Sequence, residues 1–172
     1  GARHRNIDNA ICLVRDLNEY TKWVLTMMRG HYNVSGANQV FTWTTGYPYA
    51  LEFTRGYPRY NPGEASATDL LMRGWCDALF VIASDPGAHF PQKAVERMAE
   101  IPVVCVDPEW TPTAELSDVY VPVAIAGVEV EGTAYRMDSV PLKLRKVVEP
   151  PEGVLSDVEF LEMVIEKVEE ML

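Results

Sequence analysis

The sequence predicts an α/β fold, with a doubly wound and mostly parallel sheet flanked by helices, in one domain of residues 1–172. Two observations lead to this prediction. Three short apolar runs, residues 78–83, 101–106 and 119–123, are continuous, as is typical of strands buried on both faces of a parallel sheet. Segments with helical signals lie between these runs, and strands that alternate with helices imply right-handed β-α-β crossovers.

The N-terminal region, residues 1–65, is expected to hold a helix and a long loop. Asn6 or Asp8 can cap a helix that runs to about Met28, since the apolar residues there recur near helical spacing. The chain that follows is rich in Gly, Pro, Asn and aromatic residues. Because aromatics favour order, we expect a functional loop with a short helix around 42–53.

The middle region, residues 66–127, carries the predicted β-α-β core. Ser66 or Thr68 starts its first helix, which Gly74 ends. Pro91 suits the first position of a second helix, where its missing N–H costs nothing. A brief helical turn is expected before the third strand.

The C-terminal region, residues 128–172, changes to a period of two, which predicts edge hairpins. The alternating apolar residues are Val128, Val130, Leu142 and Leu144. Residues 156–159 read Ser-Asp-Val-Glu, a capping box that opens a terminal helix. The apolar stripe of that helix consists of Val158, Leu161, Ile165, Val168 and Leu172.

Composition limits the class of protein. With 48% hydrophobic and 23% charged residues, this is the composition of an ordinary soluble globular chain. The net charge of −10 argues against a nucleic-acid partner, because no basic surplus exists to neutralise phosphates. No apolar run approaches the roughly 20 residues that cross a bilayer, so we expect no membrane span. Nothing resembles a cleavable signal peptide.

Cys12, Cys76 and Cys105 are far apart and form no Cys-x-x-Cys motif. We expect them to be buried and to behave as small hydrophobic residues, with Cys12 on the apolar face of a helix and Cys105 in a strand. The spacing of an iron–sulfur site is absent. An odd number of cysteines without a signal peptide favours the reducing cytoplasm.

The run from Met28 to Asn38 places one arginine, two glycines and two asparagines directly after the first helix. Glycine lets backbone approach a ligand closely, and asparagine offers a donor and an acceptor on a short stem. The guanidinium of Arg29 beside such a loop suits an anionic or carbonyl oxygen. The alternative is a helix C-cap followed by an ordinary polar loop.

Two further loops follow the carboxyl ends of predicted strands, where parallel sheets bind ligands. They are residues 84–89 and 107–113, and both offer backbone N–H groups, small side chains and a carboxylate. Asp85 or Asp107 could accept two hydrogen bonds from a guanine or ribose edge. Alternatively these are plain turns, since Asp-Pro and Thr-Pro are common turn formers. Neither a Gly-x-Gly-x-x-Gly nor a P-loop motif is present.

The motif Arg29-Gly30-x-x-Asn33-x-x-Gly36-Ala37 resembles the loop that carries an active-site arginine and pterin contacts in molybdopterin-dependent oxidoreductases. Residues 57–64, 84–91 and 126–138 narrow the match and resemble the B subunit of formylmethanofuran dehydrogenase. The similarity covers nearly the whole chain but only the C-terminal part of that subunit.

This resemblance implies a Rossmann-like domain that helps to bind molybdopterin guanine dinucleotide carrying tungsten or molybdenum. It implies catalytic roles for Arg29, which would hold an oxygen of CO2 or formate, and for His31, which would shuttle protons. The cofactor contacts that it implies are Asn33, Gly36, Ala83, Ser84, Asp85, Gly87, His89, Asp107, Thr111, Thr113, Gly132 and Thr133. The protein ligand of the metal would lie upstream, so this chain supplies no metal ligand.

The implied reaction is the reversible reduction of CO2 to formate, with transfer of the formyl group to methanofuran elsewhere in the complex. The implied partners are the remaining N-terminal part of the B subunit and other subunits, including iron–sulfur proteins. The isolated chain is expected to be inactive. Two alternatives remain, a non-catalytic nucleotide-binding or subunit-assembly module of the same fold and a pterin-independent interaction domain.

Overall fold

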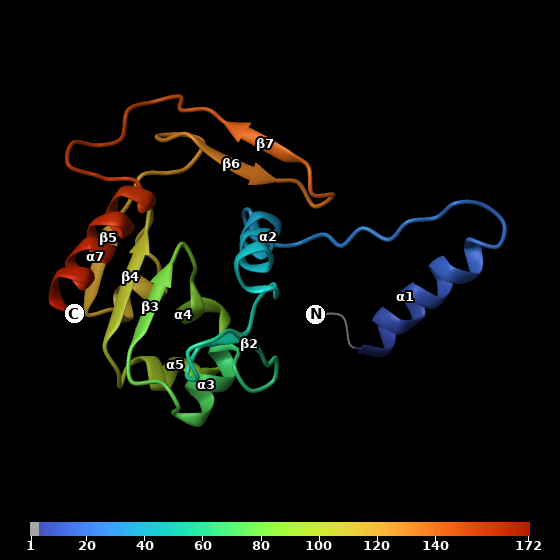
Figure 1. The fold of residues 1–172 in the computed structure, drawn as a ribbon, viewed down its shortest axis with the longest axis horizontal. Helices are drawn as coiled ribbons and strands as arrows, with labels where there is room; N and C mark the ends of the chain where they lie inside the picture. Colours follow the sequence, from blue (N-terminus) through green and yellow to red (C-terminus); the bar gives the residue numbers. More distant parts are fainter. Residues whose placement is uncertain (1–3) are drawn as a thin grey trace.

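Three parallel strands form the centre of the structure, a computed structural model that describes residues 4–172 (Figure 1). The helices are α1 (His4–Leu17), α2 (Val34–Thr45), α3 (Ala67–Arg73), α4 (Pro86–His89), α5 (Gln92–Met98), α6 (Pro112–Leu116) and α7 (Asp157–Met171). The strands are β1 (Leu51–Glu52), β2 (Arg59–Tyr60), β3 (Leu79–Ile82), β4 (Val103–Asp107), β5 (Val119–Pro122), β6 (Gly132–Tyr135) and β7 (Pro141–Leu144).

The predicted central strands are confirmed as β3, β4 and β5, which pair in parallel in that order. Val81 lies opposite Cys105, which in turn lies opposite Tyr120. Because the three strands run the same way, their carboxyl ends share one edge of the sheet. The two loops predicted to bind a ligand therefore leave the sheet at the same edge.

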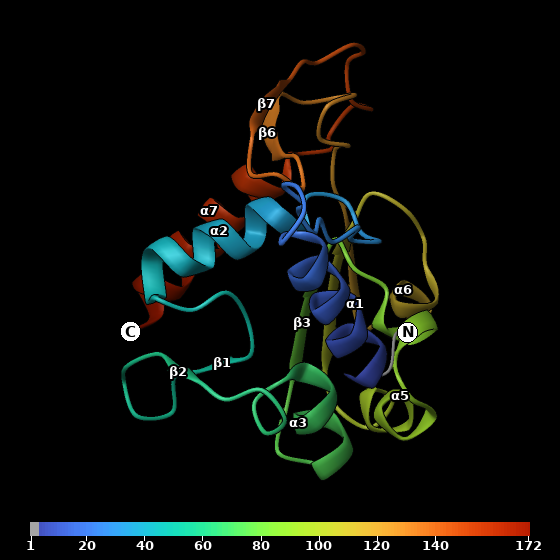
Figure 2. The same ribbon diagram turned by 90° about the vertical axis from the view of Figure 1, so that its right-hand side faces the viewer.

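The main core lies on one face of this sheet. Leu71 of α3, Val81 of β3 and Met98 of α5 are buried together there. Figure 2 shows α5 and α6 on the same side of the sheet, with α7 and α2 on the other side. A doubly wound arrangement is thus not confirmed for residues 4–172, because the helices of both crossovers lie on one face and α7 covers part of the other.

The first helix is shorter than predicted. It ends at Leu17 because the side chain of Asn18 competes for backbone groups. The Asn18 amide donates to the carbonyl of Val14 (2.6 Å) and accepts from the N–H of Trp23 (3.1 Å). An extended arm, residues 22–29, then leads to α2, and α1 stands apart from the sheet (Figure 1).

The helix predicted around residues 42–53 is wrong beyond Thr45, because the chain turns at Gly46. Helix α2 ends at Thr45, where Gly46 takes a left-handed φ of 87° and donates its N–H to the carbonyl of Thr42 (2.9 Å). Pro48 follows and cannot continue a helix. The predicted order of the aromatic region is nevertheless found in the strands and ring contacts that come next.

Those ring contacts join the two short strands β1 and β2. Tyr47 stacks on Tyr60 with ring centroids 5.4 Å apart, and Tyr49 meets the same ring edge-on at 5.7 Å. An ion pair between Arg59 and Glu52 connects the strands. The region is therefore held by local contacts rather than by a deep core.

The hairpin expected at the C-terminal side is confirmed in part. Leu142 and Leu144 belong to β7, which pairs antiparallel with β6. Val128 and Val130 do not form a strand, since the N–H of Val128 donates to the carbonyl of Ile125 (3.1 Å) and closes a turn. The hairpin packs against α2.

The capping box of the terminal helix is confirmed. Ser156 Oγ accepts from the N–H of Glu159 (3.2 Å), and the Glu159 carboxylate accepts from the N–H of Ser156 (2.9 Å). The apolar stripe of α7 is not buried as its pattern predicted, since Val158 and Ile165 are both more than half exposed. Helix α7 thus keeps an apolar surface without a partner among residues 4–172.

Among the described residues no helix is long and apolar enough to span a membrane. Of the three cysteines, Cys105 is buried and Cys76 partly buried, as expected. The prediction for Cys12 is wrong, because α1 stands away from the core and leaves this side chain exposed.

Candidate functional site

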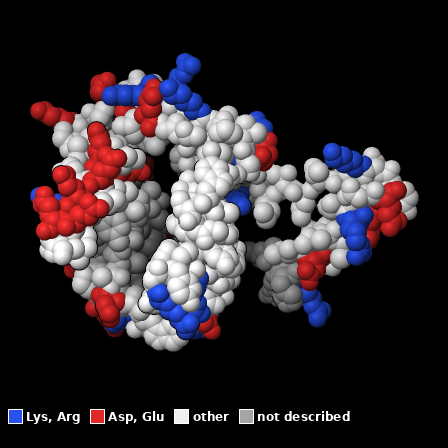
Figure 3. Space-filling model, in the orientation of Figure 1, with Lys and Arg blue, Asp and Glu red and all other residues white. Residues whose placement is uncertain are grey.

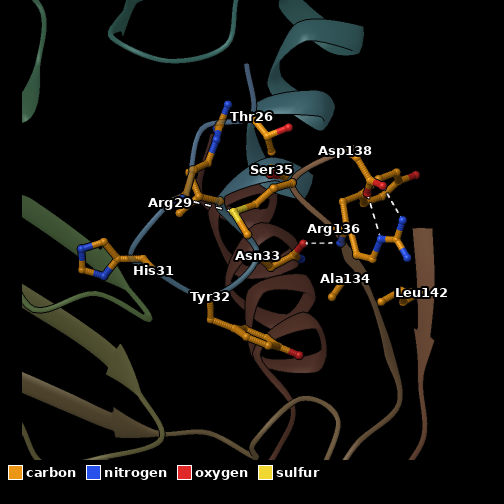
Figure 4. A pocket seen from close by; sticks show the side chains of 13 residues that line it. Thr26, Arg29, His31, Tyr32, Asn33, Ser35, Ala134, Arg136, Asp138 and Leu142 are labelled. Carbon is orange, nitrogen blue, oxygen red and sulfur yellow. Dashed lines mark hydrogen bonds and ion pairs between the residues drawn. The ribbon is translucent and has the colours of Figure 1, made fainter. Parts of the chain in front are cut away.

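A cavity of about 520 Å³ lies between the end of the N-terminal arm and the β6–β7 hairpin (Figure 4). It is lined by Thr26, Arg29, His31, Tyr32, Asn33, Val34, Ser35, Ala134, Tyr135, Arg136, Met137, Asp138 and Leu142. Three residues predicted for the site, Arg29, His31 and Asn33, are among them. The cavity exists only because two distant segments of the chain meet.

The Asn33 side chain joins these segments. Its amide nitrogen donates to the carbonyl of Thr133 (3.1 Å), and its oxygen accepts from the N–H of Tyr135 (2.8 Å). The amide thus pairs with the β6 backbone as a neighbouring strand would. Asn33 itself takes a left-handed φ of 51°, which asparagine tolerates better than most residues.

Gly36 makes this arrangement possible. It is buried in the first turn of α2, and a Cβ there would lie 2.9 Å from the Asn33 amide carbon. Only glycine leaves room for the amide. The spacing Asn-x-x-Gly, predicted to contact a cofactor, thus has a structural use in this chain, because it fixes the arm to the hairpin.

Arg29 lies at the wall between this cavity and a second cavity, which Asn38 and Pro48 help to line. The N–H of Arg29 donates to Sδ of Met137 (3.3 Å). In one orientation of its amide, Asn38 makes two hydrogen bonds. Its oxygen accepts from the Arg29 guanidinium, and its nitrogen donates to the carbonyl of Pro48 (3.2 Å). The guanidinium therefore has a defined position on α2.

The charge of Arg29 is available to a ligand. Arg136, the other arginine of the cavity, forms an ion pair with Asp138 and holds the pKa of that carboxyl below its usual range. No carboxylate among residues 4–172 lies within ion-pair distance of Arg29. An anionic group entering here would meet an uncompensated guanidinium.

The two histidines predicted for the site meet each other. The His31 ring lies edge-on to His89 with centroids 5.5 Å apart. His89 is further held by a contact of 2.7 Å between its Nδ1 and the carbonyl oxygen of Asp85. This contact links the arm beside the cavity to the loop at the carboxyl end of β3, so the two predicted halves of the site adjoin.

Asp85 and Thr113 join the two loops at the sheet edge. One oxygen of the Asp85 carboxylate accepts from Oγ1 (2.7 Å) and from the N–H (3.1 Å) of Thr113. Thr113 Oγ1 accepts from the N–H of Gly87 (2.8 Å). Gly87 allows this approach, since a Cβ there would lie 2.9 Å from the Thr113 nitrogen.

This network uses groups that the sequence assigned to a ligand. Thr113 is fully buried, so its hydroxyl points to Asp85 rather than outward. The N–H of Gly87 is likewise satisfied by Thr113. In the described structure these three residues therefore set the shape of the edge rather than present free donors to it.

Asp107 closes the same edge from β4. Its carboxylate accepts from the N–H of Glu109 (2.9 Å) and is only 7% exposed. Burial raises the pKa of this carboxyl, the charges of Glu109 and Asp85 add to the rise, and the N–H groups of Glu109 and Ser84 oppose it.

The other predicted contacts divide between the two loops and the hairpin. Ala83 takes a left-handed φ of 45° and, with Ser84, is exposed at the end of β3. Strain of this kind gathers at functional sites. Thr111 caps α6 by accepting from the N–H of Ala114 (3.2 Å).

Gly132 and Thr133 begin β6 on the cavity side of the hairpin. Thr133 takes part through its carbonyl, which accepts from Asn33, while its side chain is exposed. Gly132 is partly buried opposite Leu144. This segment thus supports the cavity wall. No group of three or more His, Cys, Asp or Glu side chains that could hold a metal ion occurs in the described part of the chain.

No family model matches the sequence. The B subunit of the tungsten-containing formylmethanofuran dehydrogenase 2 of Methanocaldococcus jannaschii is 68% identical over 99% of this chain. The protein of the same name from Methanococcus maripaludis is 62% identical over 98% of it. The chain belongs to the family of formylmethanofuran dehydrogenase B subunits. It spans 39% of the length of each relative and corresponds to the C-terminal portion, as the resemblance predicted.

A solved structure shares the fold. It is the formyltransferase/hydrolase complex of Methylorubrum extorquens with methylofuran, and one of its chains matches 93% of this chain with a TM-score of 0.74. The match covers 44% of that chain. At 20% identity, the likeness shows the fold of this part of the B subunit and nothing of its chemistry.

Sequence reasoning assigned no role to two residues of this B-subunit portion that contact Arg29, Asn38 and Met137. Asn38 lies on the first turns of α2, five residues after Asn33. A helix predicted to begin at Val34 would have placed Asn38 near the Arg29 loop. Met137 gave no signal, because its contact with Arg29 joins residues 108 positions apart. Only the three-dimensional structure shows that the hairpin tip faces the arm.

The substitution Asn33→Gly should release the arm from the hairpin. Glycine keeps the left-handed backbone but loses two amide hydrogen bonds, each worth about 1 kcal/mol. Hydrogen exchange at the Tyr135 amide should accelerate about tenfold or more, since 1.4 kcal/mol is tenfold. The Leu79 amide, bonded to Pro102 in the sheet, should exchange at its original rate. Equal acceleration at both amides would contradict the local role.

The substitution Asp107→Asn should change how stability depends on pH. Because the pKa of Asp107 is raised above its ordinary 3.8 in the folded chain, folding takes up protons there and stability falls as pH rises through that window. Asparagine keeps the acceptor for Glu109 and does not titrate. The free energy of unfolding of the variant minus that of the original should therefore rise with pH from about 3.8 to the raised pKa. A flat difference in denaturant titrations would rule this out.

Proposed function

We propose that this chain forms one wall of the cofactor and substrate site in the B subunit of a formylmethanofuran dehydrogenase. The 68% identity to a tungsten-containing enzyme subunit carries this proposal. The uncompensated guanidinium of Arg29 at the cavity supports it from the structure. The activity would belong to the whole subunit and its complex. This chain corresponds to only 39% of each matched relative.

The residues present fit the diphosphate of molybdopterin guanine dinucleotide better than its guanine. Arg29, His31 and His89 follow one another from the cavity to the sheet edge, which suits an anionic group such as a diphosphate. At the nucleotide end, Ser84 is exposed and free to donate, whereas Asp107 is shielded. We infer that contacts with guanine depend on Ser84, Thr111 and the backbone near Ala83 more than on Asp85.

Arg29 would act on the substrate by electrostatics. It stays charged at any working pH, and two of its N–H groups can hold both oxygens of a carboxylate. As CO2 takes up two electrons and a proton to become formate, negative charge grows on those oxygens and the guanidinium stabilises it. Bound tungsten or molybdenum pterin supplies the electron transfer. Asn38 keeps the guanidinium in position.

His31 would move the proton. It is exposed beside the cavity and within contact of His89, so a proton can leave or enter without crossing a buried region. The metal ligand would come from the remaining part of the B subunit, and electrons from iron–sulfur proteins of the complex. Methanofuran would receive the formyl group in another subunit.

A second function is favoured by one observation. The Asp85–Thr113 network orders both sheet-edge loops without any contribution from Arg29. A non-catalytic nucleotide-binding or assembly module would need only those loops.

Ligand titrations of the chain separate the two functions. Arg29→Ala should weaken binding of the released pterin cofactor by about 10- to 100-fold, the worth of lost charge-assisted hydrogen bonds, and leave guanosine monophosphate binding unchanged. Arg55→Ala, at an exposed arginine away from the cavity, is the matched control. Calorimetry provides the affinities. Cofactor binding that survives Arg29→Ala but is lost with Asp107→Ala would favour the nucleotide-binding module, and no binding of either ligand would favour an interaction domain.

A further inference from the structure

The side of the sheet opposite the main core is covered only in part. Along β3, the side chains of Phe80 and Ile82 are 45% and 41% exposed, whereas Val81, which faces the core, is 6% exposed. On the same face Val106 of β4 is fully buried. The cover therefore ends between β4 and β3, and Figure 3 shows a hollow at this place.

The walls of this hollow differ in charge. Helix α7 carries six acidic residues and one lysine, and its acidic side chains gather along the left of the hollow (Figure 3). Helix α2, on the right, has no charged residue. The hollow thus has an apolar floor, one uncharged wall and one acidic wall.

Such a surface needs a cover. Strands of a parallel sheet are normally buried on both faces, and soluble proteins rarely leave a continuous apolar area of this kind open. A second copy of the chain is a poor cover, because each copy carries a charge of −10 and would bring its own acidic α7 to the contact.

We propose that an amphipathic helix from the remaining portion of the same subunit fills this hollow, with apolar residues on Phe80 and Ile82 and basic residues toward α7. This inference rests on the proposed membership in a longer subunit. The chain spans 39% of its relatives, so 61% of each relative has to pack somewhere. The charge of α7 defines which flank of that helix is basic.

The docking would also shape the candidate site. Helix α2 forms one wall of the hollow, and its first turn holds Gly36 next to the Asn33 amide. A helix pressed between α2 and α7 would fix α2 against the sheet. The cavity beside Arg29 would then be rigid only in the complete subunit.

Hydroxyl-radical labelling of Phe80 tests the proposal without any cofactor. Two samples are compared, the chain alone and a complete subunit made by joining it to the remaining portion of the Methanocaldococcus jannaschii protein. Labelling of Phe80 should fall about tenfold in the complete subunit, and labelling after denaturation normalises both samples. Equal labelling of Phe80 in the two folded samples would overturn the proposal. Protection in the chain alone that grows with its concentration would indicate a second copy instead, and would also overturn it.

A paired substitution gives an independent measurement. Phe80→Thr with Ile82→Thr keeps residues that suit a strand but removes apolar area. It should lower the melting temperature of the complete subunit by more than it lowers that of the chain alone. Val147→Thr, at a residue 76% exposed in the segment before α7, is the control and should change neither. An equal drop in both proteins would show that Phe80 and Ile82 support only the fold of this chain. Because no cofactor is present, the outcome is independent of whether Arg29 binds the pterin.

Discussion

The amide of Asn33 is the contact on which the candidate site depends. It donates to the carbonyl of Thr133 and accepts from the N–H of Tyr135 in β6. These two bonds attach the N-terminal arm to a hairpin 100 residues later in the chain. Without it, the arm that carries Arg29 would lose its hydrogen bonds to β6. With it, the guanidinium is placed at the wall between two cavities. The left-handed backbone of Asn33 accompanies this contact, and the absence of a side chain at Gly36 leaves room for it.

The network of Asp85 and Thr113 does for the sheet edge what Asn33 does for the arm. It joins two loops that follow neighbouring strands, and the contact between His31 and His89 then connects the two halves. Polar residues that look like ligand contacts in the sequence are thus in part the framework of the site. The groups left for a ligand are the Arg29 guanidinium, the exposed rings of the two histidines and the strained turn at Ala83.

Local signals predicted much of this structure. The three apolar runs, the stop at Gly74 and the capping box at Ser156 depend on neighbouring residues, and all were found where expected. The end of α1 was missed because one side chain, that of Asn18, competes with helical hydrogen bonds. The exposed stripe of α7 could not be predicted, since periodicity shows which residues seek burial but not whether a partner is present.

The sequence drew attention to several residues of the candidate cavity, but not to the contacts that hold them. Spacing drew attention to Arg29, Asn33 and Gly36 together, and they do lie together. That Asn33 bonds to β6 and that Thr113 is fully buried depends on contacts between distant segments, which no local pattern contains.

The most direct measurement of the central claim is turnover between CO2 and formate by the complete subunit in its complex, with Arg29 unchanged or replaced by alanine, alongside its tungsten content. If Arg29 stabilises charge on the substrate, Arg29→Ala should lower turnover per bound tungsten by about 100-fold. Full turnover in the Arg29→Ala complex would contradict the assignment of this cavity as one wall of the active site.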